Sequence, residues 1–266
     1  MLVDIHLHSG FSFDSCEKIS NYLEKARELG VPVIGFSEHY DYDAVLDGAD
    51  IALCDIPKYV GYLNGVRAEN VSPEILCGIE FGYRDVCVEH YRRLIEDYDF
   101  DYVINSVHTL PVRGDCFQES FFAGRTIQES YREYFKAVLE SVKADFDFQI
   151  VGHLGYASRY RNCDNAKINY ADYSDILDEI LECIIVRDKC LEINAYVGKT
   201  EGLCLPDTDI ILRYLQLGGK KLSFGSDSHK AGDYLRKSTA IIEFLKSAGV
   251  DEMFYYKKRR PIAYKI

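Results

Sequence analysis

The feature that most constrains the fold is the regular alternation of short apolar runs with longer amphipathic stretches along nearly the whole chain. Seven short runs are predicted as buried strands, at residues 2–6, 33–37, 74–80, 102–107, 148–152, 190–194 and 221–225. Apolar residues at helical spacing predict helices at residues 19–29, 58–69, 88–98, 126–144, 173–188, 207–217 and 235–248. Strand and helix alternating throughout is typical of parallel β-α units. We therefore expect residues 1–266 to form a single α/β domain. A (β/α)7 TIM-like barrel is the favoured architecture and an open doubly wound sheet the alternative.

Composition restricts the class of protein further. The 266 residues are 47% hydrophobic and 28% charged, which fits a globular chain that buries a core. There is no run of about 18 apolar residues and no signal-peptide pattern at the start, so we expect no membrane association. A net charge of −12 is the wrong sign for a nucleic-acid binder. Nine cysteines without a C-x-x-C pair fit reduced thiols in the cytoplasm.

Two loops and one tail segment stand out between the predicted elements. Residues 41–55 are acidic and irregular, and residues 111–124 form a long loop with two adjacent phenylalanines. Both follow predicted strands, where the active-site loops of a barrel lie. The basic run at residues 257–260 is expected to be part of a solvated terminus.

The histidines follow the predicted strands. Six of the seven lie at or just beyond the C-terminal end of a strand: His6, His8, His39, His108, His153 and His229. Glu80 ends the third strand, and Asp227 precedes His229 by two residues. In a parallel barrel the C-terminal ends of all strands open on one face, so these groups should converge. Converging imidazoles and carboxylates predict a metal site.

Spacing and ligand type refine this prediction. The i, i+2 spacing of His6 and His8 puts both rings on one side of an extended segment, and Asp227 and His229 repeat that spacing. One such pair arises easily by chance, but six histidines in the same strand-end position do not. Imidazole and carboxylate ligands without cysteine suit Zn²⁺, Fe²⁺ or Mn²⁺. More than four candidate ligands imply more than one ion, and several ions held close together can clamp a phosphate ester.

Short motifs at these positions resemble the PHP (polymerase and histidinol phosphatase) family, most closely its stand-alone histidinol-phosphate phosphatase branch. They run in order from residue 4 to residue 229: Asp4-Ile5-His6-Leu7-His8-Ser9, Ser37-Glu38-His39, Gly78-Ile79-Glu80, Ser106-Val107-His108, Gly152-His153, Leu191-Glu192-Ile193-Asn194 and Gly225-Ser226-Asp227-Ser228-His229. The resemblance implies a distorted (β/α)7 barrel, which agrees with the seven strands counted independently.

The resemblance also implies a three-metal site. The first ion would be held by His6, His8, Glu80 and Asp227, and Glu80 would bridge to a second ion held by His108 and His153. The third ion would be held by Asp14, His39 and His229. Asp4 and Glu38 are expected to orient ligand imidazoles.

The implied reaction is hydrolysis of a small phosphate monoester, most directly L-histidinol phosphate. Asp227 or His229 would protonate the leaving alkoxide. Arg159 and Lys199 lie nearest to the places where that branch of the family grips phosphate, with Arg161 and Lys230 as rivals. Asn194 and Glu192 share one face of the sixth strand and are expected to contact the substrate or the ligands.

Other functions remain open at this stage. A PHP enzyme could act on phosphotyrosine, a nucleotide or a sugar phosphate with the same ligands. An amidohydrolase barrel also begins with H-x-H but lacks the pattern of Glu80 and Asp227-Ser228-His229. A non-catalytic metal-binding module is disfavoured because all nine ligand positions carry usable side chains.

Overall fold

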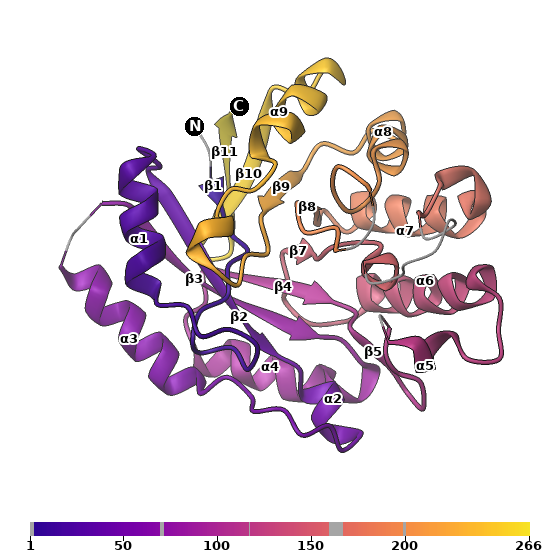
Figure 1. Ribbon diagram of the computed structural model, residues 1–266, viewed down its shortest axis with the longest axis horizontal. Helices are drawn as coiled ribbons and strands as arrows, with labels where there is room; N and C mark the ends of the chain where they lie inside the picture. The colour runs from indigo at the N-terminus through magenta and orange to yellow at the C-terminus, as the bar shows by residue number, and fades with distance from the viewer. Residues whose placement is uncertain (1–2, 70–71, 117, 160–166, 199–200) are drawn as a thin grey trace.

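A single parallel sheet forms the centre of the molecule (Figure 1). The computed structural model describes residues 3–69, 72–116, 118–159, 167–198 and 201–266. The strands follow one another in the order β1 (Val3–Asp4), β2 (Val33–Tyr40), β3 (Glu74–Gly82), β4 (Tyr102–Ser106), β7 (Ile150–Val151), β8 (Cys190–Asn194) and β9 (Leu222–Gly225). Every neighbouring pair is parallel. The seven predicted strands are thus confirmed, with β1 and β7 shorter than expected.

The two edge strands approach each other and nearly close the sheet. The backbone N–H of Ile5 donates to the carbonyl oxygen of Phe224 at 3.3 Å, and a parallel bridge joins Leu7 to Ser228. The N–H of His8 donates to the Ser228 carbonyl oxygen at 2.9 Å. The (β/α)7 barrel is therefore confirmed, and the open doubly wound alternative is wrong.

In the described part of the chain, seven main helices surround the sheet (Figure 1). They are α1 (Ile19–Glu28), α3 (Ile56–Ala68), α4 (Val88–Asp97), α6 (Ile127–Lys143), α7 (Ser174–Val186), α8 (Thr208–Gln216) and α9 (Ser238–Ser247), each within three residues of its predicted bounds. The longest, α6, begins with a capping box in which Thr126 and Glu129 satisfy each other's backbone N–H groups. Its buried face includes Tyr131, Tyr134 and Phe135. This amphipathic pattern is what made the helices predictable.

The loops at the C-terminal ends of the strands carry short elements of their own. These are α2 (Tyr42–Leu46), β5 (Thr109–Leu110), β6 (Gly114–Asp115), α5 (Glu119–Phe122) and the 3-10 turns η1 (Asp85–Cys87), η2 (Tyr156–Ser158), η3 (Tyr170–Asp172) and η4 (Ala231–Asp233). The acidic loop predicted at 41–55 therefore begins with a helical turn, and the loop at 111–124 contains half of a small antiparallel hairpin.

The C-terminal segment was not predicted. The strands β10 (Glu252–Lys257) and β11 (Arg260–Lys265) form an antiparallel hairpin. The N–H of Lys258 donates to Oδ1 of Asp101 at 3.0 Å, and the buried Tyr264 lies with its hydroxyl 3.5 Å from the carbonyl oxygen of Val3. The basic run at residues 257–260 is largely exposed, as expected, but it forms the turn of an ordered hairpin that packs against the N-terminal ends of β1 and β4. Among the described residues, no helix combines the length and apolar character needed to cross a membrane.

Candidate metal centre

The six strand-end histidines meet at the C-terminal end of the barrel. Four groups of three side chains each bring ligand atoms within 4.8 Å of one another: His8 with His39 and His229, His6 with His8 and Glu80, His6 with His153 and Asp227, and His39 with Glu80 and His108. The groups share members, so they form one continuous cluster. The seventh histidine, His90, lies outside it on α4, where its ring stacks on Tyr42 with centroids 4.2 Å apart.

Glu80 lies in the middle of this cluster. Its Oε2 is 2.9 Å from His39 Nδ1 and 3.2 Å from His6 Nε2. Its Oε1 is 2.8 Å from His153 Nε2 and 3.3 Å from His108 Nε2. The two oxygens of one carboxylate therefore face different sets of imidazoles, which is the geometry that a bridging ligand needs.

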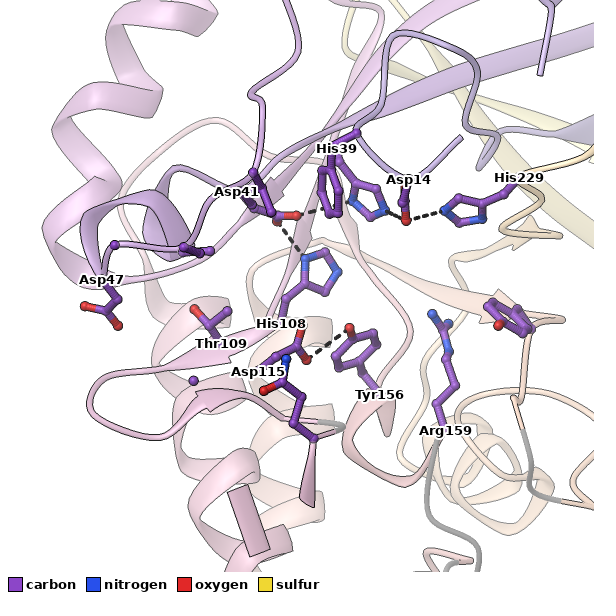
Figure 2. Close-up of a pocket in the computed structure, with 18 residues that line it drawn as sticks. Asp14, His39, Asp41, Asp47, His108, Thr109, Asp115, Tyr156, Arg159 and His229 are labelled. Carbon is purple, nitrogen blue, oxygen red and sulfur yellow. Dashed lines mark hydrogen bonds and ion pairs between the residues drawn. The ribbon is translucent and has the colours of Figure 1, made fainter. Parts of the chain in front are cut away.

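Two aspartates complete the cluster from its opposite sides. Oδ1 of Asp227 is 3.3 Å from His8 Nε2, and the residue adopts a left-handed backbone conformation with φ of 50°. Oδ2 of Asp14 is 3.0 Å from His229 Nε2 and 3.6 Å from His39 Nε2 (Figure 2). The structure thus brings together all nine side chains that the sequence marked as ligands.

The chemistry of the cluster fits divalent ions. Several converging, buried ligand atoms lie close to other ligands but form no aligned hydrogen bond among the described residues, namely His6 Nε2, His8 Nε2, His39 Nδ1, Glu80 Oε2 and His229 Nε2. Buried polar atoms in folded proteins are normally hydrogen-bonded, so this concentration points to a missing partner. Imidazole nitrogens with carboxylate oxygens are ligands for Zn²⁺, Fe²⁺ and Mn²⁺.

Electrostatic interactions among the clustered carboxylates and imidazoles, together with burial, shift their pKa values. Burial alone would raise the pKa of Glu80, but the neighbouring His6 and His39 hold it well below its usual value. Burial would lower the pKa of His39, yet the carboxylates of Glu80 and Asp14 raise it to about 9. Burial and the nearby His39 lower the pKa of His8 well below its ordinary value. Ions bound here would replace the shared protons.

Carboxylates outside the cluster fix the orientation of two ligand rings. Nδ1 of His6 lies 2.5 Å from Oε1 of Glu192, and Nδ1 of His108 lies 2.7 Å from Oδ1 of Asp41. Such carboxylate partners set the tautomer and strengthen the ligand. The sequence marked Glu192 but missed this role of Asp41. The available signal was its i, i+2 spacing from His39, which repeats the spacing of His6 and His8.

Asp4 and Glu38 have different partners from those expected. Oδ1 of Asp4 accepts from the backbone N–H groups of Ser226, at 3.0 Å, and His6, at 3.3 Å. Glu38 accepts from the Ser12 hydroxyl at 2.6 Å. Neither carboxylate contacts a ligand ring, although the Ser12 hydroxyl that Glu38 accepts from lies 3.2 Å from His8 Nδ1. Both instead hold the backbone and loop that carry the ligands.

Arg159 projects into the centre from the loop after β7. Its side chain is only 4% exposed, and its Nη2 lies 2.8 Å from Oδ2 of Asp227. The same nitrogen donates to Oδ1 of Asn194 at 3.2 Å. A guanidinium from the loop after β7 and an amide from the end of β8 thus meet beside the ligand cluster.

The other cations that the sequence singled out are less informative. Lys199 and Arg161 lie outside the described residues. Lys230 is exposed and lines a smaller pocket of 320 Å³ beside His229. Of the described candidates, Arg159 alone is buried against the cluster.

A cavity of about 540 Å³ opens above the cluster. Asp14, His39, His108, Arg159 and His229 line its inner side, while Asp41, Asp47, Asp115, Gln118 and Tyr156 line the remainder. Figure 2 shows Asp47 on the far side of this space from Arg159, with Asp115 between them beside Tyr156. One side of the cavity therefore carries the ligands and a guanidinium, and the other is acidic.

Comparison with known proteins gives consistent matches. A family model for the PHP domain matches residues 4–196. The histidinol-phosphatase of Lactococcus lactis is 32% identical, over 94% of this chain and 93% of its own. A probable histidinol-phosphatase of Clostridium acetobutylicum is 28% identical, over 97% and 98%. The crystal structure of histidinol phosphate phosphatase from Lactococcus lactis, complexed with zinc, L-histidinol and phosphate, has a TM-score of 0.86 at 28% identity and covers 98% of each chain.

Proposed function

The chain belongs to the PHP family, and we propose that it hydrolyses L-histidinol phosphate to L-histidinol and inorganic phosphate. The observation that carries this proposal is a buried guanidinium, that of Arg159, in the same cavity as a cluster of nine potential metal ligands. Cationic donors beside a metal centre suit a phosphoryl group. The relatives named for this substrate, one of them with L-histidinol and phosphate bound, support the identity of the alcohol.

The ligand assignment is part of the proposal. His6, His8, Glu80 and Asp227 would hold one ion, Glu80, His108 and His153 a second, and Asp14, His39 and His229 a third. Two to three ions of Zn²⁺, Fe²⁺ or Mn²⁺ at these positions would supply Lewis-acid stabilisation of the negative charge on the phosphoryl group. The separation of the two Glu80 oxygens toward different imidazoles supports the bridging role.

The protein's own side chains bind the phosphate and supply the proton. Arg159 would donate to phosphoryl oxygens, held in place by Asn194, and Lys199 is proposed to assist. Asp227 or His229 is proposed to protonate the leaving oxygen. Support for this pair is that His229 Nδ1 lies 3.8 Å from Asp227 Oδ1 and that His229 lines the cavity.

The acidic side of the cavity favours a cationic leaving alcohol. L-Histidinol carries an ammonium group and an imidazole, both of which donate hydrogen bonds. Asp115 and Gln118 line the cavity and can accept such bonds. Asp47 adds a carboxylate on the same side, although it is also paired with Arg84 at 2.7 Å. An acidic lining would disfavour nucleotides and other polyanionic substrates.

A comparison of two substrates tests the proposal. We expect kcat/KM for L-histidinol phosphate to exceed that for p-nitrophenyl phosphate by at least about tenfold. Because the nitrophenyl ester has the better leaving group, such a preference must come from binding of the alcohol portion. Asp115→Asn should lower kcat/KM for L-histidinol phosphate about tenfold and leave the nitrophenyl ester within about twofold.

Asp145→Asn, at a side chain that is 95% exposed, is the control and should leave kcat/KM unchanged for both substrates. A clear preference for the nitrophenyl ester would overturn the histidinol assignment but not the phosphomonoesterase activity. Turnover of phosphotyrosine, a nucleotide or a sugar phosphate above L-histidinol phosphate would identify the alternative substrate.

We also propose that residues 1–266 form one cytoplasmic metallophosphatase domain. In support, β9 lies beyond the region matched by the family model yet is a strand of the barrel, and the C-terminal hairpin packs against β9. The eight cysteines in the described part of the chain carry free thiols, as a reducing compartment would leave them.

A further inference from the structure

The guanidinium of Arg159 is stacked between aromatic rings. Its Cζ lies 4.6 Å from the ring centroid of Tyr196 and 5.1 Å from that of Tyr156. A second guanidinium, that of Arg236, stacks on the same Tyr196 ring with its Cζ 4.9 Å from the centroid. Cation–π contacts of this kind are attractive and are strongest when the cation is desolvated. One tyrosine ring therefore touches two arginines, one of which is buried beside the ligand cluster.

The loop after β8 fixes the position of the Tyr196 ring relative to Arg159. Oδ1 of Asn194 accepts from the backbone N–H of Tyr196 at 2.9 Å and also from Nη2 of Arg159 at 3.2 Å. A single amide oxygen thus links the position of the loop to that of the guanidinium. Movement of the Tyr196 backbone would change the geometry at Arg159.

Gly198 brings the same loop against the Arg159 backbone. It adopts a left-handed conformation with φ of 61°, and a Cβ at this position would collide with the carbonyl oxygen and Cγ of Arg159. Only glycine allows so close an approach. The loop from Asn194 to Gly198 is therefore packed directly onto Arg159.

Arg236 supports the ring from the side of the smaller pocket. This arginine follows η4, and its Nη2 is paired with Oδ2 of Asp233 at 2.8 Å. Tyr196 lines both the large cavity and the 320 Å³ pocket, in which Arg236 also lies. The ring thus forms a wall between the two spaces.

We propose that Tyr196, supported by Arg236, is a positioning residue that orients Arg159 for binding of the substrate phosphate. This inference rests on the phosphate-binding role proposed above for Arg159. Stacking uses the flat face of a guanidinium and consumes none of its N–H donors, so the edge remains directed at Asp227 and the phosphoryl site. The role belongs to the ring rather than to the tyrosine hydroxyl.

Tyr196→Leu tests the inference in the metal-loaded protein. We expect the dissociation constant of inorganic phosphate, measured by calorimetry, to rise about tenfold, and KM for L-histidinol phosphate to rise in parallel. The change in kcat should stay within about threefold, because the ligands of the ions are untouched. Tyr196→Phe should restore phosphate affinity to within about twofold of the original protein, and Arg236→Ala should raise the dissociation constant about threefold. Tyr62→Leu, at an exposed ring on α3, is the matched control.

A double-mutant cycle tests whether Tyr196 affects phosphate binding through Arg159. In an Arg159→Ala background, Tyr196→Leu should weaken phosphate binding by less than a further twofold, because its effect passes through Arg159. An equal tenfold loss in that background, or a Tyr196→Phe variant as weak as Tyr196→Leu, would overturn the positioning role. So would loss of metal from Tyr196→Leu in elemental analysis. If Arg159→Ala itself leaves phosphate binding unchanged, the phosphate role of Arg159 fails, whatever Tyr196 does.

Discussion

Glu80 shows how much of the centre depends on one side chain. It lies in β3 directly opposite His39 in β2, so sheet register alone makes these two residues neighbours. The side chain of Glu80 is long enough to place its carboxylate beside the imidazoles of His108 and His153, which follow β4 and β7. Ser106 donates to Oε1 at 2.6 Å and fixes the rotation of the group. Both the charge and the reach of this residue are therefore needed.

Glu80→Gln should remove the charge while preserving size and the contact with Ser106. We expect loss of at least about one ion per chain and a fall in kcat/KM of at least about 100-fold, because an amide is a poor bridging ligand. Elemental analysis of purified protein and steady-state kinetics measure the two effects. Glu140→Gln, at a side chain 67% exposed on α6, is the control. Full metal content with near-normal activity would contradict the bridging role.

The sequence indicated ligands better than it indicated their partners. His6, His8 and Glu80 were identifiable because strand ends converge in any parallel barrel. Asp41 contacts His108 across 67 positions, and its spacing from His39 was the only local signal. Tyr196 meets Arg236 through loops whose paths depend on glycine conformation and packing. No periodicity in the chain encodes such loop contacts.

At the scale of elements, the C-terminal hairpin is the clearest difference between prediction and structure. Its turn residues Lys258 and Arg259 have φ of 51° and 61°. Turns with positive φ usually contain Asn-Gly or Asp-Gly, so two basic residues gave no hairpin signal. Tertiary contacts compensate, because Asp101 accepts from both backbone N–H groups, at 3.0 Å and 2.7 Å. The helices, whose amphipathic pattern is local, were predicted closely.

Tyr264 tests whether this hairpin stabilises the barrel. Tyr264→Ala should lower the free energy of unfolding by about 3–5 kcal/mol, because it leaves a cavity where a buried ring packs on Tyr255. Tyr264→Phe keeps the ring and loses only the 3.5 Å contact to Val3, so it should cost less than about 1 kcal/mol. Urea unfolding of both variants measures the difference. Equal, small effects would show that the hairpin packs too loosely to stabilise the fold.

At the scale of the whole molecule, the two ends of the barrel serve different purposes. The hairpin lies at the N-terminal end of the strands, and the ligand cluster and cavity lie at the C-terminal end. In barrels of this kind the C-terminal face carries chemistry and the opposite face carries stability. The net charge of −12 by itself opposes binding of an anionic phosphate ester. Two or three divalent ions would reverse the local charge where the phosphate binds.

Metal binding should therefore depend on pH in a definite direction. Despite burial, the neighbouring carboxylates raise the pKa of His39 to about 9 and that of His108 well above its ordinary value. Without ions, these protonated imidazoles stabilise the fold fully below about pH 6.5, and that contribution is lost as pH rises through 9. An ion can bind only after the protons leave, so affinity for Mn²⁺ should rise by up to about tenfold per pH unit for each proton released.

Calorimetric titration of the metal-free protein with Mn²⁺ at pH 6.5, 7.5 and 8.5 measures this dependence. Repeating each titration in buffers of different ionisation enthalpy gives the number of protons released. We expect the release to be largest at pH 6.5 and to decline toward pH 9, while the gain in melting temperature on adding Mn²⁺ grows with pH. His90→Ala removes the one histidine outside the cluster and should leave proton release unchanged, whereas His39→Ala should reduce it. An affinity that stays constant from pH 6.5 to 8.5, with no proton release, would mean that the carboxylates do not hold protons on these imidazoles.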